Sequence, residues 1–139
     1  MSAPAGPGAA TIPSEDEIHA LVHGFYAKIR ADKELGPIFN GAIADWDPHL
    51  AKMCAFWSSV MRMSGRYHGN PMAAHLRLKG VDSAHFGRWL SLFGATAHEL
   101  LRPELAAAFE ARAKTIARSL ELGMFYRPGL ERPPLGETA

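Results

Sequence analysis

Residues 47–65, DPHLAKMCAFWSSVMRMSG, carry a strong helical signal. In an α-helix, where successive side chains turn by about 100°, five of these residues fall within about 40° of one line. They are His49, Met53, Phe56, Val60 and Met63. Asp47-Pro48 is a typical start, with aspartate at the N-cap and proline at the first helical position. The stretch therefore predicts a helix that buries a wide arc and carries one histidine within it.

A second helix is predicted upstream. Ser14 precedes Glu17 by three residues, which is the pattern of a capping box. Apolar residues then repeat at spacings of three and four, as on one face of a helix: Ile18, Leu21, Val22, Phe25 and Ile29. Gly36-Pro37 predicts that this helix ends by about residue 34, so that residues 38–46 form a connection.

Three more helices are predicted downstream. Asn70-Pro71 opens a short helix that ends near Leu76. Longer ones are expected from residue 82 to about residue 100 and from Pro103 to about Gly123, where glycine favours a stop. No run of alternating β-branched residues is present. The chain is therefore predicted to be all-α, with four substantial helices.

Composition limits the classes of protein that fit. The 139 residues suit one domain, and 15 basic against 14 acidic side chains leave a net charge of +1, too little for nucleic-acid binding by bulk electrostatics. The single cysteine, Cys54, excludes an internal disulfide, a cysteine zinc site and covalent haem attachment, and it favours the reducing cytoplasm. No segment approaches the ~20 apolar residues that span a bilayer.

The two ends are expected to lie outside the folded domain. Residues 1–13 and 127–139 are rich in Ala, Gly and Pro and predict flexible arms around a domain of residues 14–126. The first arm lacks the basic start and the apolar run of a signal peptide. We expect the domain to be a monomer.

Histidines are the main chemical signal, and two of the seven stand in apolar surroundings. His49 begins the stripe described above, and His75 lies in PMAAHL. Spacing alone favours a core histidine over a ligand at both positions. HExxH, P-loop and GxGxxG motifs are absent, and the carboxylates form no acid–base pair. Two buried histidines among many Phe, Met and Trp residues fit an apolar cofactor pocket, and haem needs one imidazole and apolar walls.

Six short elements, in this order, resemble the truncated haemoglobins. They are Phe25-Tyr26, Pro37-Ile38-Phe39, His49 with Phe56-Trp57, the stretch YHGNPM over residues 67–72, His75 and Trp89. YHGNPM and His75, combined with His49, are most similar to the third group of that family. The resemblance covers about residues 14–125. It implies a two-over-two helical sandwich that holds haem b, iron protoporphyrin IX, without a covalent bond.

The resemblance also implies roles for individual residues. His75 matches the proximal iron ligand, Tyr26 and Trp89 match distal hydrogen-bond donors, and His49 matches a distal position that contacts the ligand or gates its access. Lys52 matches a position near a haem propionate. The remaining residues expected to hold the cofactor are Phe25, Phe39, Met53, Phe56, Tyr67, Met72 and Phe86.

Other interpretations of these residues stay open on sequence alone. Tyr26 also fits a boundary tyrosine with its hydroxyl in water, Trp89 a core tryptophan, and Lys52 a solvated lysine. His85 is a second histidine within reach of the proximal side. The alternative partners for a propionate are Arg62, Arg66, Tyr67 and His68.

Three functions follow from these observations. The first is a haem protein that binds O₂, NO or CO and oxidises NO to nitrate or reduces peroxide. Because the chain has no flavin or nicotinamide motif, its electrons would come from a separate reductase. The second is a gas-binding or sensing globin without turnover, and the third is a helical interaction domain without haem.

Overall fold

The computed structural model describes residues 12–76 and 80–125, which contain six helices and no strand. The helices are α2 (Glu15–Ala31), α3 (Leu35–Ala42), α4 (Trp46–Arg62), α5 (Pro71–Leu76), α6 (Ser83–Leu100) and α7 (Pro103–Phe125). The all-α prediction is confirmed. The expected arms lie outside the described residues except for Ile12 and Pro13.

Helix α2 begins at the predicted capping box. The Ser14 hydroxyl accepts a hydrogen bond from the Glu17 amide at 3.0 Å, and the Glu17 carboxylate accepts one from the Ser14 amide at 2.8 Å. These bonds satisfy amides that have no partner inside the helix. The opposite side of the helix is almost inaccessible to solvent at Ile18, Leu21, Val22, Phe25 and Ile29. Helix α2 is thus fixed along its whole inner face.

The prediction of one helix to residue 34 and a connection over residues 38–46 is wrong. Helix α2 ends at Ala31, and Asp32 starts a new turn by accepting hydrogen bonds from the amides of Glu34 at 3.0 Å and Leu35 at 2.8 Å. Gly36-Pro37 therefore stands in the first turn of α3. A proline is tolerated there because amides of the first turn have no partner within the helix.

Two other helix limits also differ from the prediction. Helix α4 begins two residues earlier than predicted, because Asp45 and not Asp47 is its N-cap. It ends at Arg62, and the following residue, Met63, takes the left-handed conformation at φ 56°. Helix α7 continues through Gly123 to Phe125. The Met72 side chain of α5 fills the space that a side chain at residue 123 would need, so this glycine permits a close helix contact instead of a stop.

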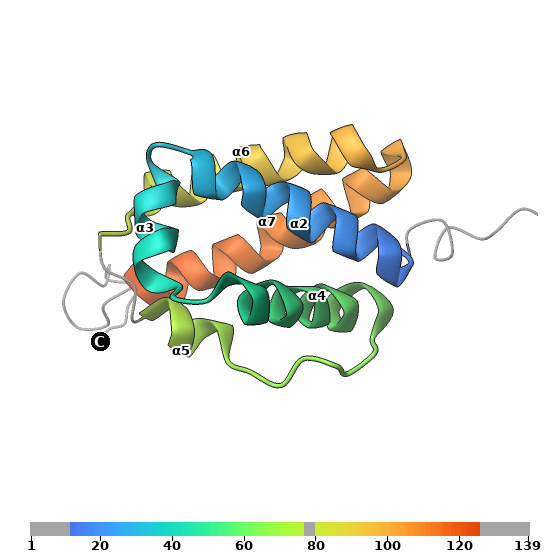
Figure 1. Cartoon of the computed structure of the whole chain (residues 1–139), viewed down its shortest axis with the longest axis horizontal. Coiled ribbons are helices and arrows are strands. Elements are labelled where there is room, and N and C mark those ends of the chain that lie inside the picture. Colours follow the sequence, from blue (N-terminus) through green and yellow to red (C-terminus); the bar gives the residue numbers. More distant parts are fainter. Residues whose placement is uncertain (1–11, 77–79, 126–139) are drawn as a thin grey trace, which may run out of the picture.

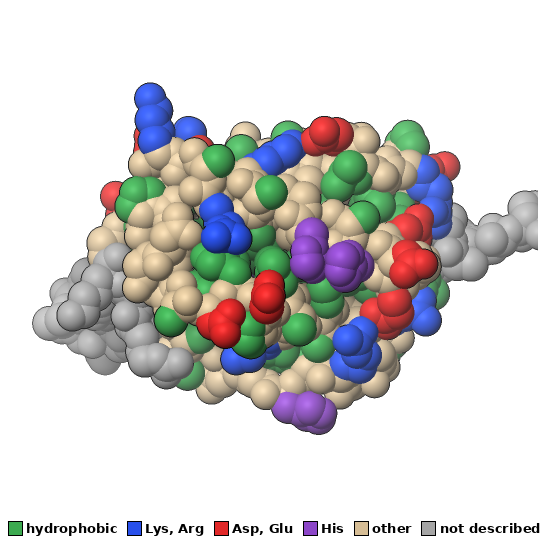
Figure 2. All heavy atoms as spheres, in the orientation of Figure 1, with side chains coloured by type: hydrophobic (Ala, Val, Ile, Leu, Met, Phe, Trp, Pro, Cys, Tyr) green, Lys and Arg blue, Asp and Glu red, His purple; other side chains and the backbone are tan. Residues whose placement is uncertain are grey.

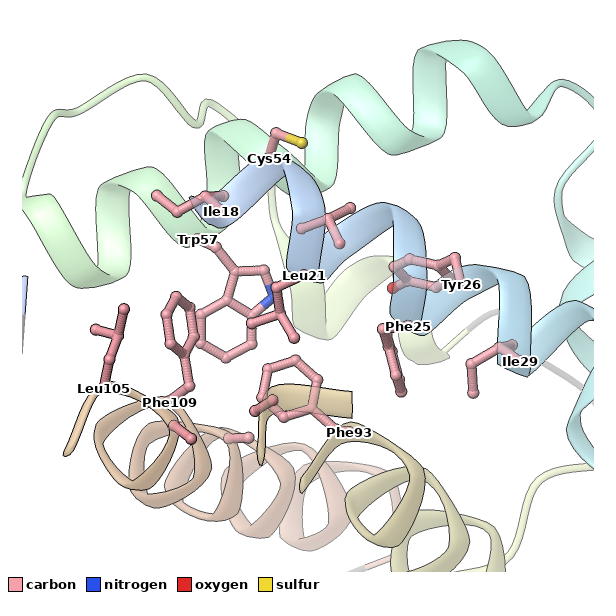
Figure 3. Packing of buried hydrophobic residues seen from close by; sticks show 14 of the residues in the cluster. Ile18, Leu21, Phe25, Tyr26, Ile29, Cys54, Trp57, Phe93, Leu105 and Phe109 are labelled. Atoms are coloured by element: carbon pink, nitrogen blue, oxygen red, sulfur yellow. The ribbon is translucent and has the colours of Figure 1, made fainter. Parts of the chain in front are cut away.

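The helices form two pairs that lie across each other, as Figure 1 shows. Helix α2 packs against α4 and α6, and α6 packs along α7. Phe25, Trp57, Phe93 and Phe109 meet where the two pairs touch (Figure 3). This is the predicted two-over-two arrangement, and it places α4 and the short α5 on one side of the core.

The outer surface carries mixed charge. Figure 2 shows basic and acidic side chains interspersed with hydrophobic ones on one face of the molecule. None of the helices in the described residues has the length and apolar character required to cross a membrane.

Candidate functional site

Tyr26 lies at the centre of an aromatic cluster formed by α2, α3 and α4. Its ring centroid is 4.9 Å from Phe25, 6.0 Å from Phe39, 5.7 Å from Trp46 and 5.2 Å from His49. The residue is 6% exposed, which excludes the boundary position considered from sequence. Burial raises the pKa of the hydroxyl, so the proton stays on it. Among the described residues the hydroxyl has no hydrogen-bond partner, and it is therefore available as a donor.

His49 lies beside this tyrosine at the start of α4. Its ring meets Tyr26 and Trp46 nearly at right angles, at 5.2 and 5.4 Å between centroids. The Nε2 atom is buried and has no hydrogen-bond partner among the described residues. Burial lowers the pKa of His49, helped by the positive charges of Lys52 and His75. Because an unpaired buried polar atom is costly, its position points to a partner from outside the chain.

Trp89 contributes a third polar group from α6. Its ring stacks on Phe93 at 5.3 Å and 5°, and meets Phe25 edge-on at 5.2 Å. Phe93 stacks in turn on Trp57 at 5.1 Å. The indole N–H makes no hydrogen bond with any described residue. The stack holds the indole in one orientation and leaves its N–H group without a partner in the described part of the chain.

His75 occupies the short helix α5. Its Nδ1 atom is 2.7 Å from the carbonyl oxygen of Pro71. A carbonyl can only accept a hydrogen bond, so this contact places the proton on Nδ1 and leaves the lone pair of Nε2 free.

His85, the alternative to His75, has the opposite arrangement. Its Nδ1 accepts the amide of Asp82 at 2.9 Å in a capping box at the start of α6. A neutral ring that accepts at Nδ1 carries its proton on Nε2 and has no free lone pair there. Of these two histidines, only His75 is prepared to bind a metal.

Helices α4, α5 and α7 border an open cleft of about 590 Å³. Two of the residues predicted to hold the cofactor, Phe56 and Met72, line it. Tyr67 packs on Phe56 at 5.2 Å between centroids, and its amide donates to the Ser59 hydroxyl at 2.9 Å. Partial burial raises the pKa of the Tyr67 hydroxyl. Phe56 therefore contacts Tyr67 and also lines the cleft that Met72 lines.

The remaining predicted residues are more dispersed. Met53 packs half-buried on the main core, and Lys52 is exposed on α4. Phe86 belongs to a second apolar cluster with Ala117, Leu120 and Met124. The structure therefore brings Phe25, Phe39 and His49 into contact with Tyr26, whereas Phe86 lies in the second cluster.

Two of the alternative propionate partners are already engaged. Glu15 forms ion pairs with the guanidinium groups of Arg62 at 3.2 Å and Arg66 at 2.6 Å. The Arg62 guanidinium also donates to the carbonyl of Pro13 at 2.6 Å. His68 is exposed. The carboxylate that holds both arginines lies at the start of α2, far from them in sequence.

Sequence reasoning missed Trp46. Its ring contacts both Tyr26 and His49, its N–H donates to the Asn40 side chain at 3.2 Å, and the Arg30 guanidinium lies 4.6 Å from its centroid. The available signal was a single large aromatic directly before the Asp47-Pro48 start. The predicted helix start at Asp47 leaves Trp46 in the connection over residues 38–46, whereas Trp46 is the first residue of α4.

Solved structures with this fold are truncated haemoglobins. The crystal structure of group III truncated hemoglobin from Campylobacter jejuni matches with a TM-score of 0.78 and 33% identity, covering 82% of this chain and 93% of that one. The group II truncated hemoglobin from Bacillus anthracis shares the fold, with a TM-score of 0.70 and 23% identity over 86% of this chain and 92% of that one. No family model matches the sequence.

A curated relative refines this class. The group 3 truncated hemoglobin ctb of Campylobacter jejuni is 35% identical over 120 residues, which cover 84% of this chain and 94% of the relative. The chain therefore belongs to the group 3 truncated haemoglobins.

Proposed function

We propose that the chain holds haem b between α4 and α5 and binds diatomic gases there, with Nε2 of His75 as the protein ligand to the iron. The observation that carries the proposal is the 2.7 Å contact between His75 Nδ1 and the Pro71 carbonyl. Metal-binding histidines commonly donate their other ring N–H to such a group, which fixes the tautomer and the ring plane.

The residues present fit this cofactor. When bound, haem would supply an iron atom that can hold a diatomic gas once His75 is its protein ligand. His49 carries a buried Nε2 that has no partner among the described residues and could meet such a ligand, and Met53, Phe56 and Met72 offer apolar surface. Lys52 is free on the surface of α4 to meet a propionate. Cys54 lies buried in the core, where burial raises the pKa of its thiol, so the cofactor is expected to be non-covalent.

Tyr26 and Trp89 are proposed to hold the gas. Both carry a proton donor without a protein partner, and both are fixed by aromatic contacts. A diatomic ligand with partial negative charge is stabilised by about 1.5–3 kcal/mol for each well-aligned donor. Two donors therefore slow release by orders of magnitude, because ~1.4 kcal/mol is a factor of ten.

Slow release favours chemistry on the gas over its delivery. We therefore propose that the protein oxidises NO to nitrate with bound O₂, which supplies both added oxygen atoms, or reduces peroxide. A separate reductase would supply the electron for each NO oxidised, or the two electrons for each peroxide reduced. His49, neutral by its lowered pKa, is proposed to control access to the pocket.

Absorption spectra of the purified protein test the proposal. We expect haem b by the pyridine haemochrome assay, a five-coordinate ferrous form, and new spectra with O₂ and CO. Colourless protein that does not take up added haem would overturn the assignment. Consumption of NO or peroxide under a reductant then separates turnover from gas binding alone.

A further inference from the structure

Two histidines on the outer side of α2 lie outside the site described above. The rings of His19 and His23 are stacked, with centroids 3.9 Å apart and an interplanar angle of 18°. Residues four apart share one face of a helix. Both side chains are exposed, and Figure 2 shows two neighbouring histidines over α2.

Both rings are free of other partners. Within the described part of the chain neither His19 nor His23 has a hydrogen bond or an ion pair. Burial lowers the pKa of His23, and the charge of His19 lowers it further, while the Asp47 carboxylate acts in the opposite direction. The net direction keeps the His23 ring neutral at neutral pH, with a lone pair available.

The spacing suits two bonds to one ion. Nitrogens that each lie about 2.0–2.1 Å from a metal are at most about 4 Å apart, and the two ring centroids are 3.9 Å apart. Small rotations of the exposed rings can turn one nitrogen of each toward a common point. The helix backbone holds both residues in place, because the inner face of α2 is buried.

We propose that His19 and His23 form a surface site for a divalent transition-metal ion, with Cu²⁺ preferred over Ni²⁺ and Zn²⁺. Imidazole suits these ions, and affinity follows their usual order when the ligands are not arranged to select one geometry. No group of three or more His, Cys, Asp or Glu side chains suited to a metal occurs in the described residues, so water completes the coordination.

The Asp47 carboxylate, in the first turn of α4, acts on His23, where its charge raises the pKa against the two lowering effects. A cation held by α2 is therefore also attracted to α4, which adds a contact present only in the folded chain. Because the unfolded chain lacks this geometry, the ion should raise the melting temperature.

The full chain, as purified, is titrated with CuCl₂ in a non-coordinating buffer at pH 7.5 by calorimetry and by copper EPR. We expect one Cu²⁺ per chain that shows coupling to two nitrogens, and a higher melting temperature. The double variant H19A/H23A should bind at least tenfold more weakly and lose both the coupling and the thermal shift. Zn²⁺ should bind more weakly than Cu²⁺.

The matched control is H68A/H98A, which removes two other exposed histidines. Like H19A/H23A, it leaves the amino terminus of the chain unchanged. It should bind Cu²⁺ like the unmodified chain. Unchanged binding by H19A/H23A, or loss of binding by H68A/H98A, would overturn the proposal. These readouts follow copper rather than haem, so they stay decisive if the proposed gas-binding function fails.

Discussion

The proton on Nδ1 of His75 is held by the carbonyl oxygen of Pro71, one helical turn earlier, at 2.7 Å. Both groups belong to a helix of six residues, so the ring is oriented by its own backbone. The partner is a main-chain atom and cannot be lost by side-chain mutation. The orientation of Nε2 is thus a property of the local fold.

The first prediction concerns this histidine. His75→Ala should abolish stable haem uptake, because no other described histidine has a hydrogen bond that fixes the proton on Nδ1 and leaves the lone pair of Nε2 free. The ratio of Soret to protein absorbance after gel filtration measures the loss. His85→Ala is the control and should keep its haem, since the Nδ1 of His85 serves a helix cap. Normal haem content in His75→Ala protein would show that the ligand is wrong.

The second prediction concerns the two free donors. Tyr26→Phe and Trp89→Phe should each speed O₂ dissociation by about tenfold or more, because each removes a charge-assisted hydrogen bond. Stopped-flow displacement of O₂ by CO measures the rate. CO carries little charge, so its own dissociation should change less. Equal effects on both gases would indicate that these side chains act by steric contact.

The third prediction assigns His49 to access. Its ring packs against Tyr26 and Trp46 at the start of α4. Rotation of this side chain away from the two rings is the proposed opening step. His49→Ala should change ligand association rates more than dissociation rates, as measured by flash photolysis. It should also remove a pH dependence that lies below the ordinary histidine pKa of ~6.5, because burial lowers the pKa of His49. A large rise in O₂ dissociation with unchanged association would make His49 a stabiliser of the ligand instead.

The fourth prediction follows from the lowered pKa of His49. As the pH falls below about 6.5, the unfolded chain takes up the proton before the folded one does, so the folded state loses stability. The loss is at most about 1.4 kcal/mol per pH unit and ends once the folded pKa is passed. Thermal unfolding of His49→Gln between pH 5 and 8 should show a shallower decline. His68→Ala, an exposed control, should keep the original slope.

The fifth prediction concerns the Asp32–Arg88 pair, which joins the α2–α3 corner to α6. Arg88 donates from Nε and Nη2 to the Asp32 carboxylate at 2.6–2.9 Å, and the Asp32 side chain is 7% exposed. These bonds, with those from the Leu35 and Glu34 amides, hold the pKa of Asp32 well below its usual range. The stability from this pair is therefore present above pH ~4 and is lost in stronger acid.

Asp32→Asn should lower the melting temperature more than Glu99→Gln does. The control breaks the Lys28–Glu99 pair, whose side chains are 38% and 59% exposed and which contributes little. Calorimetry at pH 7 compares the two variants. Equal changes would show that the corner does not depend on Asp32.

The sequence was sufficient wherever a helix carried its own signals. Ser14 and Asp82 marked two helix starts correctly, and apolar spacing identified the buried face of α2. Gly36-Pro37 misled, because a proline in the first turn of α3 resembles one that ends a preceding helix. The boundary between α2 and α3 is set by the Asp32 side chain, which accepts hydrogen bonds from the Glu34 and Leu35 amides. These bonds depend on the folded backbone and are not visible in the sequence.

Sequence reasoning named Tyr26 and His49 as candidates, but it missed Trp46 and the contacts among the three. Tyr26, His49 and Trp46 meet only after α2 has packed on α4, and no spacing along the chain encodes that meeting. The pairing of Arg66 with Glu15, 51 residues away, likewise depends on the folded chain. The tautomer of His75 is fixed by the backbone oxygen of Pro71, and because every residue has such an oxygen, the sequence does not reveal this contact.

The rings of Trp57, Phe93 and Trp89 lie in one continuous stack from the core to the pocket. The third tryptophan of the chain, Trp46, touches Tyr26 and His49. Each indole of the chain therefore belongs to, or touches, a residue proposed for the haem site, since Trp57 also packs on Phe56. A light-absorbing group seated there would quench it by energy transfer, and the chain thus carries its own optical indicator of pocket occupancy.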